Sequence, residues 1–220
     1  MEDWSAHARR EEERYRDGEA RLPDASDPDS RQRQLTRMGN AAYGAGLSYL
    51  MLADHERACE WLTRAVERYG ESFDDAPPGS WGRPIGAMKA RVLAGDWDEA
   101  EEAARWALGA GAADADSPIG KYAAALACLV LGEYERARRL ADEIRTRDDF
   151  PPAVGDAIAM IAAGSDKPGY IVAVEEVLES FEQRDEHLED VPVADTVLVL
   201  QALAERRDLA AELSSPVLPE

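Results

Sequence analysis

A short motif recurs four times along this chain of 220 residues and restricts its fold more than any other feature. In each copy a small residue is followed, after one spacer, by an aromatic residue, and after two more spacers by alanine. His55 takes the aromatic position in the first copy, and extra residues lengthen the turn between Gly164 and Tyr170 in the fourth. The motif alanines are spaced 42, 37 and 36 residues apart, and they are Ala58, Ala100, Ala137 and Ala173. Self-similarity at such a period is typical of repeat architectures.

Apolar stretches with helical periodicity flank every copy, which places each motif at the turn of a helical hairpin. A glycine or other small residue ends the first helix, where the turn favours a positive φ. The aromatic residue leans back over the first helix, and the alanine lets the second helix approach closely. One hairpin cannot bury both of its faces, so neighbouring hairpins must stack to complete a core. The sequence therefore predicts an all-α chain of about four stacked hairpins.

The motif positions resemble those of the tetratricopeptide repeat (TPR) family. The first copy fits five positions of that family, with Gly46, Ala53, His55, Ala58 and Ala65. The later copies depart from it, since two small positions hold Met88 and Ile144 and the fourth copy keeps only Tyr170 and Ala173. The resemblance covers about residues 39–182 and implies a right-handed α-solenoid of about four TPR-like hairpins. A further apolar helix, predicted over residues 193–206, is expected to cap this stack.

Two regions are expected along the chain. Residues 1–30 comprise a charged N-terminal helix, predicted over 2–21, and a linker rich in Pro, Asp and Ser over 22–30. Residues 31–220 are predicted to form the solenoid domain with its capping helix. The first 40 residues hold ten acidic residues and eight arginines, so this Arg-rich segment is nearly neutral.

Acidic residues outnumber basic ones by 45 to 25, which gives the chain a net charge of −20. They occur in small groups along the whole repeat region, which favours a solvated acidic coat over one binding patch. With only three lysines among its bases, the composition resembles that of proteins from salt-loving archaea, whose cytoplasm holds molar salt. A GC-rich bacterial origin is the alternative. We expect no nucleic-acid binding, because the net charge repels phosphates, and no membrane span or secretory signal, hence a cytoplasmic protein.

The sequence lacks the motifs of common catalytic sites. It has no glycine-rich phosphate loop and no serine nucleophile elbow. His55 and Cys59 have the i, i+4 spacing of two metal ligands, yet no second pair stands nearby. Cys59 and Cys128 lie in apolar helical patterns and are expected as buried free thiols. We therefore predict no catalysis, metal or cofactor, and keep an enzyme on a helical scaffold as the weaker alternative.

Candidate binding residues lie on the first helix of each hairpin, because the resemblance implies that these helices line a concave groove. The groove positions that it assigns are Asn40, Tyr43, Leu47, Ile85, Lys89, Tyr122 and Leu126. Ordinary packing between repeats is the competing interpretation of each of them. Lys89 and Lys121, two of the three lysines, fall on these helices, where a compact ammonium can meet a carboxylate. Trp81, in a predicted long loop, is either a partner anchor or a residue that pins its own loop.

These observations predict a non-catalytic scaffold, adapted to high salt, that binds a protein or peptide partner in its groove. A second resemblance supports an alternative. An apolar helix followed by residues 212–219 is similar to the C-terminus of one family of all-helical immunity proteins. That resemblance implies neutralisation of a polymorphic toxin.

Overall fold

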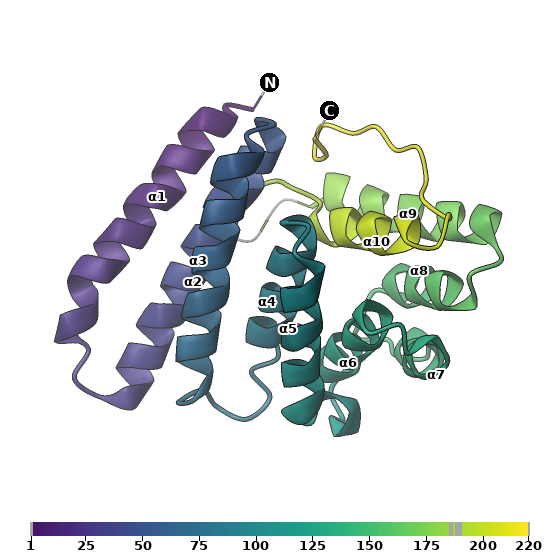
Figure 1. Ribbon diagram of the computed structural model, residues 1–220, viewed down its shortest axis with the longest axis horizontal. Helices are drawn as coiled ribbons and strands as arrows, with labels where there is room; N and C mark the ends of the chain where they lie inside the picture. The colour runs from purple at the N-terminus through teal and green to yellow at the C-terminus, as the bar shows by residue number, and fades with distance from the viewer. Residues whose placement is uncertain (1, 185–186, 188–190, 220) are drawn as a thin grey trace.

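The computed structural model describes residues 2–184, 187 and 191–219, and its regular structure is entirely helical over those residues (Figure 1). The α-helices are α1 (Trp4–Arg21), α2 (Pro28–Met51), α3 (His55–Phe73), α4 (Gly82–Leu93), α5 (Trp97–Gly109), α6 (Pro118–Val130), α7 (Tyr134–Arg145), α8 (Pro152–Ala163), α9 (Lys167–Glu182) and α10 (Asp195–Glu205). The predicted all-α fold is thereby confirmed. Within the described segments, no helix combines the length and the apolar character that crossing a bilayer demands.

Each predicted hairpin turn contains a residue with positive φ. The four residues are Ala53 (54°), Gly95 (74°), Gly132 (72°) and Gly164 (70°). In three turns an aspartate follows and caps the next helix, its carboxylate accepting a hydrogen bond from the backbone N–H three residues on. Such a cap stabilises a helix by about 1 kcal/mol. The spacer between the small residue and the aromatic residue is therefore itself a helix-start signal.

Helices α1 to α9 form a curved row in which each helix packs against the next one in sequence (Figure 1). The motif alanines lie in the core between neighbouring helices, and none of the four is more than 4% exposed. Their small side chains allow the close approach that the repeat pattern predicts. The structure thus supports the hairpin assignment helix by helix.

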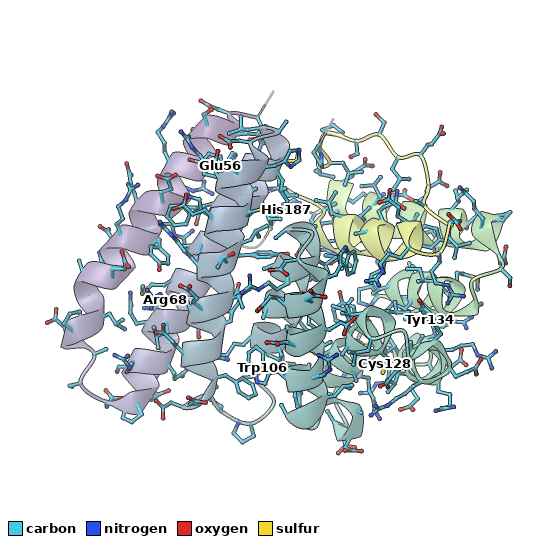
Figure 2. The ribbon with its side chains drawn as sticks, in the orientation of Figure 1. Glu56, Arg68, Trp106, Cys128, Tyr134 and His187 are labelled. Carbon is cyan, nitrogen blue, oxygen red and sulfur yellow. The ribbon has the colours of Figure 1, made fainter. Side chains whose placement is uncertain are left out.

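The charged N-terminal helix α1 packs along α2, and its Tyr15 side chain also reaches α3. Tyr15 meets the Trp61 ring edge-on, with 5.4 Å between ring centroids. Arg68, labelled in Figure 2, donates from its Nε to the Tyr15 hydroxyl at 2.9 Å. Because α2 begins at Pro28, the proposed division between residues 30 and 31 falls within its first turn. Helix α1 therefore shares an apolar core with the repeats.

The sequence predicts that helix α10 caps the end of the row, but it also reaches back to α4. It contacts α4, α8 and α9. Helix α10 and the two residues after it meet three of the motif aromatics. Arg206, the C-cap, lies 4.2 Å from the Trp97 ring centroid, and Arg207 lies 3.8 Å from the ring centroid of Tyr134, which Figure 2 labels. The Tyr170 hydroxyl donates to the Gln201 side chain at 2.8 Å. This part of the chain thus contacts the motif aromatics of three hairpins.

Candidate functional site between helices α2 and α4

A cavity of about 330 Å³ lies between α2 and α4, beside the first residue of α10. It is lined by Thr36, Asn40, Tyr43, Tyr69, Gly82, Arg83, Ile85, Gly86, Lys89 and Asp195. Four of the predicted groove positions, on two different helices, therefore come together here: Asn40, Tyr43, Ile85 and Lys89. Its volume lies at the lower end of the range for small-ligand sites. We call it the α2–α4 cavity.

The Tyr69 side chain, from α3, forms the floor of this cavity. Its ring passes between Gly39 of α2 and Gly86 of α4, where a Cβ would stand 2.8 Å and 2.6 Å from ring carbons. Only glycine leaves room for the ring at either position. The Tyr69 hydroxyl donates to the Asn40 side-chain oxygen at 3.1 Å. The two glycines thus leave room for the Tyr69 ring to pack closely against both helices.

A buried polar network forms one wall. The Lys89 ammonium donates to Asp195 Oδ2 at 2.9 Å and to the Thr196 hydroxyl at 2.7 Å. The Tyr43 hydroxyl donates to the same carboxylate oxygen at 3.0 Å. Burial raises the pKa of Tyr43 well above its ordinary value, and the neighbouring carboxylate of Asp195 adds to the effect. Tyr43 is therefore a neutral hydrogen-bond donor in this wall.

The ion pair between Lys89 and Asp195 stays charged. Burial is the largest influence on the pKa of Lys89 and lowers it, but Asp195 and Tyr122 together hold that pKa above its ordinary value. Burial alone raises the pKa of Asp195, while Lys89 and the Tyr43 hydroxyl lower it overall. A protonated ammonium has no free lone pair, so Lys89 is not a nucleophile. The charged groups of this wall are paired with each other and hold fixed positions.

Arg83 lines the cavity from the start of α4. Its Nε donates to the Ser72 hydroxyl at 2.9 Å, and its Nη2 donates to the Gln32 side-chain oxygen. Both acceptors are buried and uncharged. Burial lowers the pKa of Arg83, although a guanidinium remains protonated in proteins. The cavity therefore contains a cation beside two neutral groups.

The other predicted groove residues belong to the packed interior. Leu126 is 0% exposed, and the Tyr122 ring packs against Phe150 with 5.4 Å between centroids. Leu47 lines a separate cavity of about 90 Å³ beside Tyr43. Helix α10 lies against α4 and α8, the first helices of two hairpins, and it therefore covers part of the surface that the resemblance assigns to a groove.

Trp81 does not project from its loop as a partner anchor, because it is only 9% exposed. Its ring nitrogen lies 2.9 Å from the position that a Cβ on Gly120 would occupy, at the start of α6. The interpretation that Trp81 pins its own loop fits this placement. Lys121, the other lysine on a first helix, pairs with Glu143 at 2.9 Å.

The sequence analysis did not predict six of the ten lining residues, among them Tyr69, Arg83 and Asp195. Tyr69 belongs to a second helix, which the groove prediction leaves out, and Asp195 is more than 100 residues from its partner Lys89. Gly39 and Gly86 could have indicated this site from the sequence. A glycine inside a helix costs stability, so two of them on neighbouring first helices indicate a close contact there.

A larger cleft of about 520 Å³ lies between α1 and α3. Its charged side chains pair largely with one another, as in Arg16 with Glu12 at 2.7 Å and Arg64 with Glu60 at 2.6 Å. Exposed pairs of this kind are typical of a solvated surface. Buried aromatic residues line both sites, Tyr49 and Trp61 in this cleft. The α2–α4 cavity differs in bringing together four of the predicted groove positions, and we therefore take it as the candidate site.

The two cysteines are free thiols, Cys128 buried and Cys59 half-buried. Burial raises the pKa of Cys128 to about 11, which keeps its sulfur protonated near neutral pH. Among the described residues no three side chains of the metal-ligating types converge. What the α2–α4 cavity offers is apolar contact surface, a fixed ion pair and the Arg83 guanidinium.

No family model matches the chain, and no curated protein or solved structure matches it significantly. Function must therefore be inferred from the α2–α4 cavity and its surroundings.

Proposed function

We propose that this protein is a non-catalytic scaffold, a right-handed α-solenoid of TPR-like hairpins, that binds a peptide segment of a protein partner at the α2–α4 cavity. One observation carries this proposal. Four of the groove residues that the family resemblance assigns line one cavity with an aromatic floor. Aromatic and aliphatic side chains in a concave site are what anchor residues of a peptide bind.

Two further observations support the repeat assignment. The four turns share a positive φ at the same motif position, and the helices from α1 to α9 pack in sequence order. Stacking of this kind is how helical repeats complete their cores. Since α10 lies against α4, α8 and α9, the proposed partner contacts chiefly α2 and α4.

We also propose that the acidic coat adapts the protein to high salt. Most ion pairs among the described helix residues are exposed and join residues three or four positions apart in sequence, where such pairs contribute little to stability. The excess negative charge then acts mainly through long-range repulsion. At molar salt the Debye length falls to about 3 Å, so this repulsion is screened.

Filling the cavity from Gly82 tests the proposed function. A Cβ at this lining residue meets nothing within 4 Å, so Gly82→Phe introduces a ring into or across the cavity with little strain. Gly70→Phe is the matched control, because Gly70 is exposed on α3, is also free of neighbours within 4 Å and lies outside the cavity. Peptides are selected on the wild-type chain from a random displayed library, in buffer containing molar KCl.

Selected peptides should bind Gly82→Phe at least about 10-fold more weakly than wild type, a loss of about 1.4 kcal/mol, and bind Gly70→Phe unchanged. Fluorescence anisotropy with labelled peptides measures both affinities. Peptides that bind all three proteins equally, or a library that yields no binders, would reject the cavity as a partner site.

A further inference from the structure

Arg83 is the one charged group lining the α2–α4 cavity that has no oppositely charged partner among the described residues. The cavity is lined by three ionisable charges, and the Lys89 ammonium and the Asp195 carboxylate neutralise each other at 2.9 Å. The hydrogen bonds of the Arg83 guanidinium go to Ser72 and Gln32, which carry no charge. The cavity therefore has a net charge of about +1 at neutral pH.

This arrangement stands out in a chain with 45 acidic residues. Many exposed arginines pair with a carboxylate on their own helix, as Arg16 and Arg145 do. Arg83 is partly buried, and the charged form of a partly buried group loses hydration that neutral acceptors replace only in part. A ligand that supplies a carboxylate would restore the missing interaction.

The guanidinium has capacity for such a ligand. It carries five N–H donors in one plane, and its two side-chain acceptors engage Nε and Nη2. The plane of a guanidinium matches a carboxylate in geometry, and an ammonium does not offer that match. Lys89 does not play this role, because its charge is already neutralised by the Asp195 carboxylate and its ammonium also donates to Thr196.

The space next to Arg83 suits an apolar group of ring size. Tyr43, Tyr69 and Ile85 supply aromatic and aliphatic surface, while Gly82 and Gly86 add no side chain to the wall. A volume of about 330 Å³ accommodates one such group with its polar substituent. The two requirements, a carboxylate and a ring, meet in the same cavity.

We propose that the α2–α4 cavity binds a carboxylate carried on a ring-sized apolar group, with the carboxylate on Arg83 and the ring over Tyr69. A free aromatic acid and an acidic residue beside an aromatic one in a partner segment both have this chemistry. The second source rests on the proposed function, and the first does not. An amine is excluded by repulsion from Arg83, and a neutral amide forms weaker hydrogen bonds to it.

Three matched compounds test the charge preference: phenylacetate, phenylacetamide and phenethylamine. Isothermal titration calorimetry at constant ionic strength is expected to show phenylacetate binding in the range of about 1 mM. It should bind about 10-fold more tightly than the amide, and the amine should not bind. Gly82→Phe should abolish binding of the acid, because its ring occupies the same space.

Variants of Arg83 test whether the preference for the acid over the amide depends on this residue. Arg83→Gln should reduce the acid-to-amide ratio to about one, and Arg83→Lys should restore part of it by returning the charge. Arg37→Gln is the control, since Arg37 is exposed on α2 and lies outside the cavity. Circular dichroism checks that each variant is folded. An equal affinity for acid and amide, a preference that survives in Arg83→Gln, or no binding of phenylacetate up to about 20 mM overturns the proposal.

A second arm distinguishes the two sources. Acetyl-Phe-Asp-amide and acetyl-Phe-Asn-amide repeat the comparison in peptide form, without a terminal carboxylate. Tighter binding of the free acid than of the acidic dipeptide assigns the site to a small molecule, and the reverse order assigns it to a partner segment. An acid preference in the compounds together with an empty peptide selection would reject the proposed function and leave this inference standing.

Discussion

The Lys89 ammonium and the Asp195 carboxylate form a buried ion pair, 2.9 Å apart, between two residues separated by 106 positions in the sequence. The pair connects α4, in the middle of the row, to the first residue of α10. Tyr43 adds a hydrogen bond to the carboxylate, and the ammonium donates a second one to Thr196. The wall of the α2–α4 cavity and the position of the last helix therefore depend on the same contact.

Removing one charge of this pair should be costly. Asp195→Asn leaves a buried ammonium without its carboxylate, and such a change typically destabilises a protein by about 3–5 kcal/mol. Urea unfolding followed by circular dichroism measures the loss. The double variant Lys89→Met with Asp195→Leu buries no charge and should recover more than half of the lost stability. A loss below about 1 kcal/mol in Asp195→Asn would show that the pair is solvated.

The pH dependence of this contribution has a defined sign. The pKa of Asp195 is lower in the folded protein than its ordinary value of 3.8, so the unfolded chain binds the proton more readily. The stabilisation is fully present above about pH 5 and is lost as pH falls through the lowered pKa. The difference in unfolding free energy between wild type and Asp195→Asn should shrink between about pH 5 and pH 3. A difference that grows on acidification would contradict this assignment.

The glycines beneath the cavity should not tolerate a methyl group. A Cβ on Gly86 would stand 2.6 Å from the Tyr69 ring, so Gly86→Ala should destabilise the fold by about 1–3 kcal/mol through overpacking. Gly70→Ala, with no atom within 4 Å of its Cβ, should instead stabilise it by about 0.5–1 kcal/mol. Thermal unfolding of the two single variants gives the comparison. Equal effects of the two alanines would mean that the Tyr69 ring is not held there.

Salt should raise the stability of this protein. Screening of a net charge of −20 removes self-repulsion from the folded state, which is more compact than the unfolded chain. Between about 0.1 and 1 M KCl we expect the melting temperature to rise by about 5 °C or more, as calorimetry measures it. Sucrose at matched osmolality is the control, since it stabilises without screening. A flat response to KCl would remove the support for high-salt adaptation.

The contact of Arg207 with the Tyr134 turn should stabilise the position of α10. Its guanidinium lies 3.8 Å from the ring centroid, and its Nη1 donates to the Ala162 carbonyl oxygen at 3.1 Å. Arg207→Ala should cost about 1–2 kcal/mol, and Arg207→Lys should recover only part, because an ammonium does not stack. Arg138→Ala, on the exposed face of α7, should change stability by less than about 0.5 kcal/mol. Equal losses at the two arginines would argue against a role in fixing α10.

Local features of the fold could be predicted because they are encoded by residues close in sequence. The spacing from the small residue to the alanine places the turns, and Gly95, Gly132 and Gly164 all adopt the positive φ that such turns favour. Ala53 adopts it as well, although an alanine pays a steric cost there. The hydrophobic periodicity places the helices between these turns.

The path of α10 and the composition of the cavity could not be predicted in the same way. That Lys89 would meet a carboxylate could be predicted from its place on a first helix, but its partner Asp195 lies 106 residues away. The sequence allowed either a groove or ordinary packing for Tyr122 and Leu126, and their buried positions fit the packing interpretation. Contacts between distant helices depend on how the whole row curves, and no local pattern encodes that curvature.

The return of α10 to α4 has a consequence for synthesis on the ribosome. Hairpins formed by neighbouring helices can assemble as they emerge, but Lys89 must wait for Asp195, which is translated 106 residues later. During that interval the nascent chain exposes the apolar surface that α10 later covers. This surface is therefore covered only at the end of translation. Until then it is accessible to a chaperone or an early partner.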